Sequence, residues 1–81
     1  MTFEFSGPEP LYAQLADELQ RRIEAGVYPV GQRIPSEAEI REEFGVGRTT
    51  TRAAVEILRG KGRVVTAKGR GTYVIAPSPA E

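Results

Sequence analysis

Two short stretches in the second half of the chain concentrate side chains that can bind a polyanion. The first contains Arg48, Thr49, Thr50 and Arg52, which fall at the start of a predicted helix. A guanidinium group can bind guanine or phosphate through two N–H donors, and threonine can contact phosphate or a thymine methyl group. These residue types at this spacing make the stretch a candidate for contact with the bases and backbone of DNA, although on their own they fit a solvated helix face better.

The second stretch is Lys68-Gly69-Arg70-Gly71, the predicted turn of a β-hairpin. Its two basic side chains are flanked by glycines, so the backbone of the turn can approach phosphates or a narrow groove closely. The glycines also suit the turn itself, and this simpler role is compatible with DNA contact. The hairpin is therefore a candidate wing.

The net charge of the 81-residue chain is zero, but the charges are unevenly distributed. Residues 1–43 carry four basic and nine acidic side chains, a net −5, whereas residues 44–72 carry seven basic and one acidic, a net +6. The basic block contains both candidate stretches. A local basic region of this kind is typical of nucleic-acid-binding domains.

Composition excludes most catalytic chemistry and argues for one small domain. The chain has no cysteine and no histidine, so we expect no disulfide, no thiol or imidazole catalysis, no metal site and no cofactor. A domain of this length buries a thin core, which favours a partner surface over a deep pocket. No pair of carboxylates placed for acid–base catalysis is evident, so we expect no enzyme activity.

The chain shows no sign of secretion or membrane insertion. Its first thirty residues carry seven charged side chains and no apolar run, so we expect no signal peptide. No apolar stretch approaches the roughly 20 residues of a membrane span. We therefore expect a cytoplasmic protein.

The helices that must position the candidate residues follow from the apolar periodicity. The first begins near Leu11 and ends at Gly26, with a predicted inward stripe of Leu11, Tyr12, Leu15, Ala16, Leu19 and Ile23. The second begins after Ser36, which forms a capping box with Glu39, and ends at Gly45. Its inward residues are Ile40 and Phe44.

A third helix follows Val46-Gly47 and ends at Gly60 or Gly62, with Thr51, Ala54 or Val55, and Leu58 inward. β-branched residues at Val64–Thr66 and Thr72–Ile75 then predict the hairpin, and residues 32–34 are a candidate for a very short strand. The predicted fold is mainly α with a small β-hairpin. It is a winged helix-turn-helix of three helices and a two- to three-stranded wing, spanning residues 10–75 between a flexible arm (1–9) and a linker or disordered tail (76–81).

Simpler roles exist for several candidates. Arg48 and Arg52 suit a solvated helix face, on which Arg52 would pair with Glu56 four residues later. Capping is the first role of Ser36, although a helix N-terminus also attracts phosphate. For Tyr12 and Tyr73 we expect partial burial in the core instead of phosphate contact. The order of the elements favours the DNA-binding interpretation over these alternatives.

Four blocks occur in an order and at separations that resemble the GntR family of bacterial transcription regulators. They are Pro10-Leu11-Tyr12, Gly31-Gln32-Arg33-Ile34-Pro35-Ser36-Glu37, Phe44-Gly45-Val46-Gly47-Arg48-Thr49-Thr50 and Gly69-Arg70-Gly71-Thr72-Tyr73-Val74. The resemblance covers about residues 10–75 and implies a winged helix-turn-helix. By the family pattern, operator DNA would meet Arg48, Thr49, Thr50 and Arg52, a phosphate would meet Ser36, and Gly69, Arg70 and Gly71 would place the wing in the minor groove.

Five positions depart from that pattern. Ala38 stands where the family often has a base-contacting arginine, and Gly47 replaces the usual serine cap. Thr51 replaces a valine, Arg41 a small residue and Arg63 an apolar one. We expect the Thr51 hydroxyl to bond to a carbonyl one turn earlier, which reduces the cost of its burial.

The resemblance also implies how such a domain works. We expect a sequence-specific DNA-binding regulator, a repressor, that binds a palindromic operator as a homodimer. Family members usually carry a C-terminal domain that dimerises and binds a small-molecule effector, so this chain is either the DNA-binding part of a longer regulator or a solitary domain. The alternative function is a winged helix that binds another protein.

Overall fold

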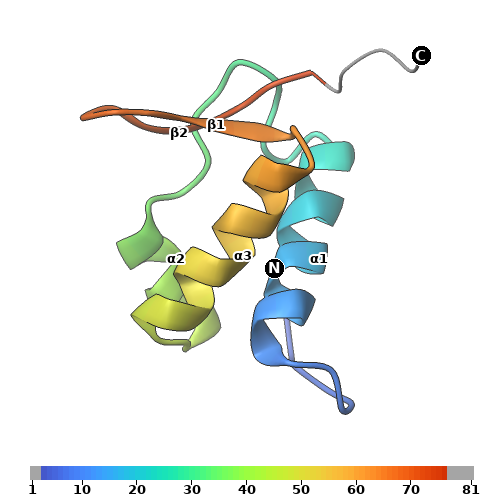
Figure 1. Ribbon diagram of the computed structural model, residues 1–81. Helices are drawn as coiled ribbons and strands as arrows, with labels where there is room; N and C mark the ends of the chain where they lie inside the picture. Colours follow the sequence, from blue (N-terminus) through green and yellow to red (C-terminus); the bar gives the residue numbers. More distant parts are fainter. Residues whose placement is uncertain (1–2, 77–81) are drawn as a thin grey trace.

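The computed structural model describes residues 3–76 and contains three helices followed by a hairpin (Figure 1). The helices are α1 (Leu11–Glu24), α2 (Glu37–Phe44) and α3 (Arg48–Gly60), and the antiparallel strands are β1 (Val64–Ala67) and β2 (Gly71–Val74). The predicted winged helix-turn-helix is therefore confirmed. Within the described residues, no helix is long and apolar enough to cross a membrane.

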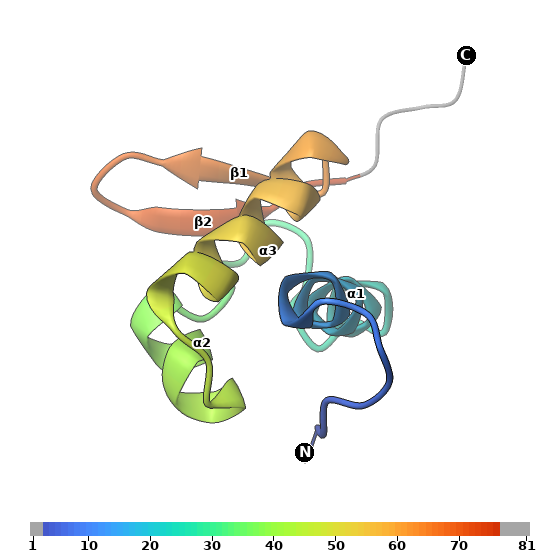
Figure 2. The ribbon, with the colours of Figure 1, turned by 60° about the horizontal axis from the view of Figure 1, so that its bottom comes forward.

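Helices α1 and α2 flank α3, and the hairpin crosses the C-terminal end of α3 (Figures 1 and 2). In both views the turn of the hairpin projects away from α1, on the side where α2 lies. The arrangement leaves one side of α3, between α2 and the hairpin turn, facing away from α1. The candidate residues of the third helix and of the wing lie on elements that border this side.

The core lies between the three helices and the base of the hairpin. Its members are Leu15, Ala16, Leu19, Ile23, Tyr28, Ile34, Ile40, Phe44, Ala54, Val55, Leu58, Val64 and Val74. Most of the predicted inward residues are among them. Two predictions were wrong: Leu11 is 46% exposed and Tyr12 is 43% exposed, because the first turn of α1 extends beyond the packed layer. Tyr73 is partly buried, as expected.

The sheet has two strands, and the predicted short strand is reduced to one isolated bridge beside it. Arg33 forms an isolated antiparallel bridge with Tyr73. Backbone hydrogen bonds flank it, from Ile34 to Thr72 at 2.9 Å and from Val74 to Gln32 at 2.9 Å. The segment that leads into α2 is therefore fixed to the outer edge of β2.

The stretch before α1 packs against the helices from Phe3 onward. The rings of Phe3 and Phe5 stack edge to face at 5.1 Å, and the Phe3 ring lies 5.7 Å from that of Phe44 on α2. The Gln14 side chain ties the same stretch to α1 by accepting from the Ser6 amide and donating to the Glu9 carbonyl. These contacts were not predicted from the sequence. Residues 77–81 of the predicted tail lie outside the described residues.

Candidate nucleic-acid interface

The first turn of α3 is open at its N-terminal end. Gly47, at the N-cap, supplies no side-chain hydrogen bond, and the turn contains no acidic residue. The free N–H groups and the helix dipole both favour an anion there. Thr51 faces the core instead, and its hydroxyl donates to the Gly47 carbonyl at 3.0 Å, which confirms the predicted back-bond.

We define the recognition surface as Arg48, Thr49 and Arg52, three exposed side chains that line one shallow hollow on α3 together with Ala53 and Glu56. Glu56 forms an ion pair with Arg59, and among the described residues the pair between Arg52 and Glu56 that belongs to the solvated-face alternative is not present. Among the described residues, neither Arg48 nor Arg52 has an ion-pair partner. Thr50 is half-buried and lies outside the hollow.

The start of α2 shows the predicted capping box. Ser36 Oγ accepts from the Glu39 amide at 3.1 Å, and the Ser36 amide donates to Glu39 Oε1 at 2.8 Å. The hydrogen bond from the Ser36 backbone, followed by that of its hydroxyl, lowers the pKa of the Glu39 carboxyl. In the capping bond to the Glu39 amide, the Ser36 hydroxyl is the acceptor.

The turn of the wing exposes its two basic side chains. Lys68, Gly69 and Arg70 are exposed, and the turn is closed by a hydrogen bond from the Arg70 amide to the Ala67 carbonyl at 2.8 Å. Gly69 has φ +78°, a conformation that favours glycine. Gly71 is half-buried, so it contributes to the wing through its backbone conformation more than through an exposed surface.

A buried cluster that links α1 to α2 was not predicted from the sequence. Arg22 is 5% exposed and Glu18 is 3% exposed, and they form an ion pair at 3.0 Å on α1. The Arg22 guanidinium also donates to the Tyr28 hydroxyl at 3.0 Å and to Glu43 at 2.9 Å, which links α1 to α2. Glu18 lies outside the apolar stripe predicted for this helix, and its spacing of four residues from Arg22 was the available signal.

The hydrogen-bonding environment explains the charge states of this cluster. Burial raises the pKa of Glu18, but the hydrogen bonds and charges of Arg21 and Arg22 together lower it below its usual value. Burial lowers the pKa of Arg22, whereas its bonds to Tyr28, Glu18 and Glu43 together raise it above the ordinary arginine value. The Arg22 guanidinium also lies 4.9 Å from the centre of the Phe44 ring. These groups serve the fold.

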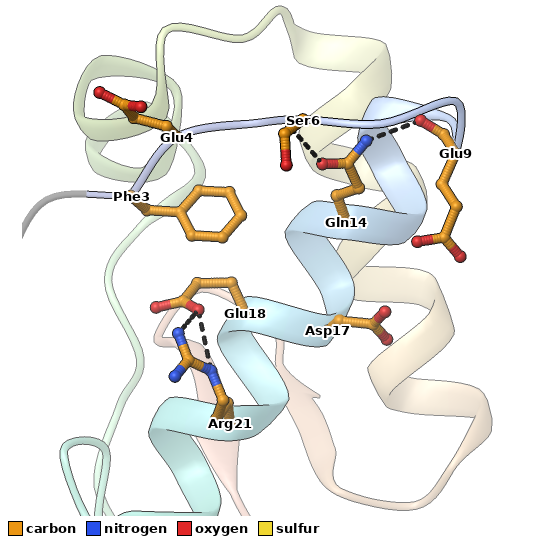
Figure 3. Close-up of a pocket in the computed structure, with 8 residues that line it drawn as sticks. All are labelled: Phe3, Glu4, Ser6, Glu9, Gln14, Asp17, Glu18 and Arg21. Carbon is orange, nitrogen blue, oxygen red and sulfur yellow. Dashed lines mark hydrogen bonds and ion pairs between the residues drawn. The ribbon is translucent and has the colours of Figure 1, made fainter.

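A hollow between the N-terminal stretch and α1 has a different chemistry from the recognition surface (Figure 3). Its lining is mainly acidic or amide: Phe3, Glu4, Ser6, Glu9, Gln14, Asp17, Glu18 and Arg21. The hydrogen bonds drawn there connect Gln14 to Ser6 and Glu9, and Arg21 to Glu18. Among the described residues, no group of three or more acidic side chains is arranged to hold a metal ion.

The departures from the family pattern have local explanations at two positions. Thr51 satisfies its hydroxyl through Gly47, as described above. The Arg63 side chain is mostly buried, and its Nη1 lies 3.6 Å from Glu24 Oε2. This ion pair links α1 to the start of the hairpin. Nothing in the structure explains Arg41.

Relatives of this chain are bacterial regulators. The family described as "Bacterial regulatory proteins, gntR family" matches residues 11–74. The Exu regulon transcriptional regulator of Escherichia coli is 43% identical over 76 residues, 94% of this chain and 30% of that protein. The transcriptional repressor NagR of Bacillus subtilis is 36% identical over 77 residues, 95% of this chain and 32% of that protein. The chain thus spans about 30% of the length of these relatives.

Solved structures agree with the family match. A structure described as AraR(DBD) in complex with operator ORE1 superposes with a TM-score of 0.81 and 37% identity, covering 86% of this chain and 93% of that one. A GntR family regulator from Listeria monocytogenes superposes with a TM-score of 0.83 and 27% identity, covering 88% and 62%. With its three helices and two-stranded hairpin in the same arrangement, the chain belongs to the GntR family of bacterial regulatory proteins.

Proposed function

We propose that this chain binds operator DNA in a sequence-specific manner, as the DNA-binding part of a transcription regulator that represses its target genes. The observation that carries the proposal is the recognition surface: two arginines without ion-pair partners among the described residues surround one hollow at the open N-terminal end of α3. Cations left unpaired on a surface can bind phosphates and release the counterions of DNA. The AraR complex, in which a similar domain is described with an operator, supports the same function.

In this proposal α3 lies in the major groove. Arg48 and Arg52 contact base edges or phosphates, and Thr49 and Thr50 contact the backbone or a thymine methyl group. Ser36 donates to a phosphate beside α2. Lys68 and Arg70 bring positive charge to the minor groove, where Gly69 and Gly71 allow the backbone to come close. No catalytic residue and no cofactor are needed for this function.

We further propose that two copies bind the two halves of a palindromic operator. A helix-turn-helix domain reads only a few base pairs in one major groove, and a pair on a two-fold site doubles the contacts. An effector would act through a further domain of a longer protein. The curated relatives, about three times the length of the matched segment, support this organisation.

Selection of bound sequences from a random duplex library tests the proposal, followed by titration of the selected duplex at two salt concentrations. We expect a palindrome whose affinity falls steeply with salt. Removing Lys68 or Arg70 should reduce the slope of log affinity against log salt by about 0.9 for each phosphate that the side chain neutralises. Enrichment of isolated half-sites would contradict pairing on a palindrome. No enrichment by a folded sample would contradict DNA binding and favour a protein partner.

A further inference from the structure

Within residues 3–76, one side chain from outside the hairpin hydrogen-bonds to the tip of the wing, residues 67–71. Arg33 Nη1 donates to the Arg70 carbonyl at 3.3 Å, across 37 positions in the sequence. Among the described residues, no other hydrogen bond reaches the tip from outside the hairpin. Nearer the base, Arg59 Nη2 donates to Thr66 at 2.6 Å, and Thr66 and Thr72 lie 3.5 Å apart.

The conformation at Gly71 provides the space for this contact. Gly71 has φ +123°, and a Cβ atom built on it would lie 2.5 Å from Arg33 Cδ and 3.1 Å from Arg33 Cγ. The aliphatic part of Arg33 therefore crosses the hairpin directly over this glycine. Any larger residue would have to displace Arg33 and adopt a strained backbone conformation. The contact with Arg33 thus explains why glycine is required at position 71, in addition to its role in the turn.

Arg33 itself is well anchored to the helix-turn-helix. Its backbone bridges Tyr73, and the next residue, Ile34, is 2% exposed in the core. Two residues further along, Ser36 begins the capping box of α2. The side chain of Arg33 thus joins the exposed turn of the wing to a segment whose position is fixed by the core and by α2.

We propose that Arg33 is a positioning residue for the wing, which it holds in place relative to α2 and α3 before DNA is bound. A loop ordered in advance loses less conformational entropy on binding, so its contacts contribute more to affinity. The contribution of Lys68 and Arg70 to DNA affinity then depends on Arg33. The DNA part of this inference rests on the proposed function, whereas the ordering of the wing can be measured without DNA.

The first test measures the order of the wing in the free protein. Backbone ¹⁵N relaxation of residues 67–71 is compared between the unchanged chain and Arg33→Met, which removes the guanidinium but keeps an aliphatic side chain. We expect order parameters of the tip to fall from values typical of rigid backbone, about 0.85, toward those of flexible loops, about 0.6, while α2 and α3 are unchanged. Unchanged order at the tip would overturn the proposal, whether or not the chain binds DNA.

The second test is a double-mutant cycle on a duplex that the chain binds. The reduction in affinity caused by Arg70→Ala, which leaves the Arg70 carbonyl in place, is measured with Arg33 present and with Arg33→Met. We expect this reduction to be smaller by a factor of about three or more when Arg33 is absent. Equal reductions in the two backgrounds would overturn the proposal, because they would show Arg33 and the wing acting independently.

Lys61→Met is the matched control, since it also removes one positive charge but lies at the far end of α3, where Lys61 bonds to Gln20. In that background the reduction caused by Arg70→Ala should equal that in the unchanged chain. If Lys61→Met weakened the effect of Arg70→Ala as strongly as Arg33→Met does, the cause would be net charge, and the positioning role would be rejected. If no duplex is bound at all, the proposed function fails while the relaxation test still decides the role of Arg33.

Discussion

Arg22 of α1 and the pair Arg48 and Arg52 of α3 have opposite environments. Arg22 is buried and bonded to Glu18, Tyr28 and Glu43, and it makes a direct link between α1 and α2. Arg48 and Arg52 are exposed around a hollow and have no ion-pair partner among the described residues. The same residue type thus stabilises the domain in a buried cluster and is left available for a ligand on an exposed surface.

The difference follows from the cost of desolvating a charge. A guanidinium removed from water must be paired and hydrogen-bonded, so the acidic residues of the first half of the chain are needed close to Arg22. An exposed guanidinium remains hydrated and can exchange water and counterions for phosphate or a base edge. The zero net charge of the chain therefore hides one compensated cluster and one uncompensated surface.

The strongest test of the comparison is Arg22→Met. Removing one partner leaves Glu18 buried and Glu43 without its bond, so we expect the free energy of unfolding to fall by about 3 kcal/mol. Urea denaturation followed by circular dichroism measures this change. Arg21→Met is the matched control: the Arg21 side chain is 73% exposed although it also pairs with Glu18, and its removal should cost less than about 1 kcal/mol.

The reverse behaviour is expected of Arg52→Ala. It should lower affinity for the selected duplex by about 1 to 3 kcal/mol and relax specificity at one base pair, with the free energy of unfolding almost unchanged. Titration of the selected duplex and of single-base variants measures both effects. An equal reduction on random DNA would instead make Arg52 a phosphate contact, and a large decrease in stability would contradict the separation of the two surfaces.

Acid should weaken the paired cluster through Glu18. Burial raises the pKa of Glu18, but Arg21 and Arg22 lower it by a larger amount. The pKa in the folded chain therefore lies below that of the unfolded chain. Glu18 therefore stabilises the fold fully above about pH 4.3, the usual glutamate pKa, and this contribution is lost as the pH falls through the folded-state value.

The free energy of unfolding is measured by urea denaturation between about pH 6 and about pH 3, on the unchanged chain and on Glu18→Gln. This comparison isolates the effect of Glu18 because the two proteins have every other carboxylate in common. The unchanged chain should be the more stable at the upper pH, and the gap should narrow on acidification. A gap that stayed constant across this range would show that Glu18 does not titrate differently in the folded chain.

Local rules predicted much of the fold and of the candidate site. The capping box at Ser36, the left-handed Gly45 that ends α2 and the back-bond of Thr51 each depend on residues within four positions of one another. The exposed turn at Lys68–Arg70 likewise follows from nearby glycines. Such short-range chemistry can be deduced from residue types and spacing.

Features that join distant segments were not predicted. The bond between Arg33 and the Arg70 carbonyl and the link between Arg22 and Glu43 depend on how α1, α2 and the wing pack. The exposure of Tyr12 has the same origin, since periodicity gives the inward face of a helix but not the length over which other elements cover it. The two long-range bonds and the exposure of Tyr12 all depend on tertiary packing, which residue spacing does not predict.

The smallest expected effect concerns Thr51, a buried residue of α3 that precedes the exposed Arg52 in the sequence. Thr51→Val removes the hydroxyl bond to Gly47, worth about 1 kcal/mol, and adds a buried methyl group, worth about 0.8 kcal/mol. The Gly47 carbonyl keeps its bond from the Thr51 amide at 3.1 Å, so no buried acceptor is left without a partner. We expect the free energy of unfolding to change by less than about 0.5 kcal/mol and duplex affinity to stay the same. A clear drop in affinity with normal stability would mean that the Thr51 hydroxyl helps to orient the first turn of α3, and that the packed and open faces of this helix are coupled.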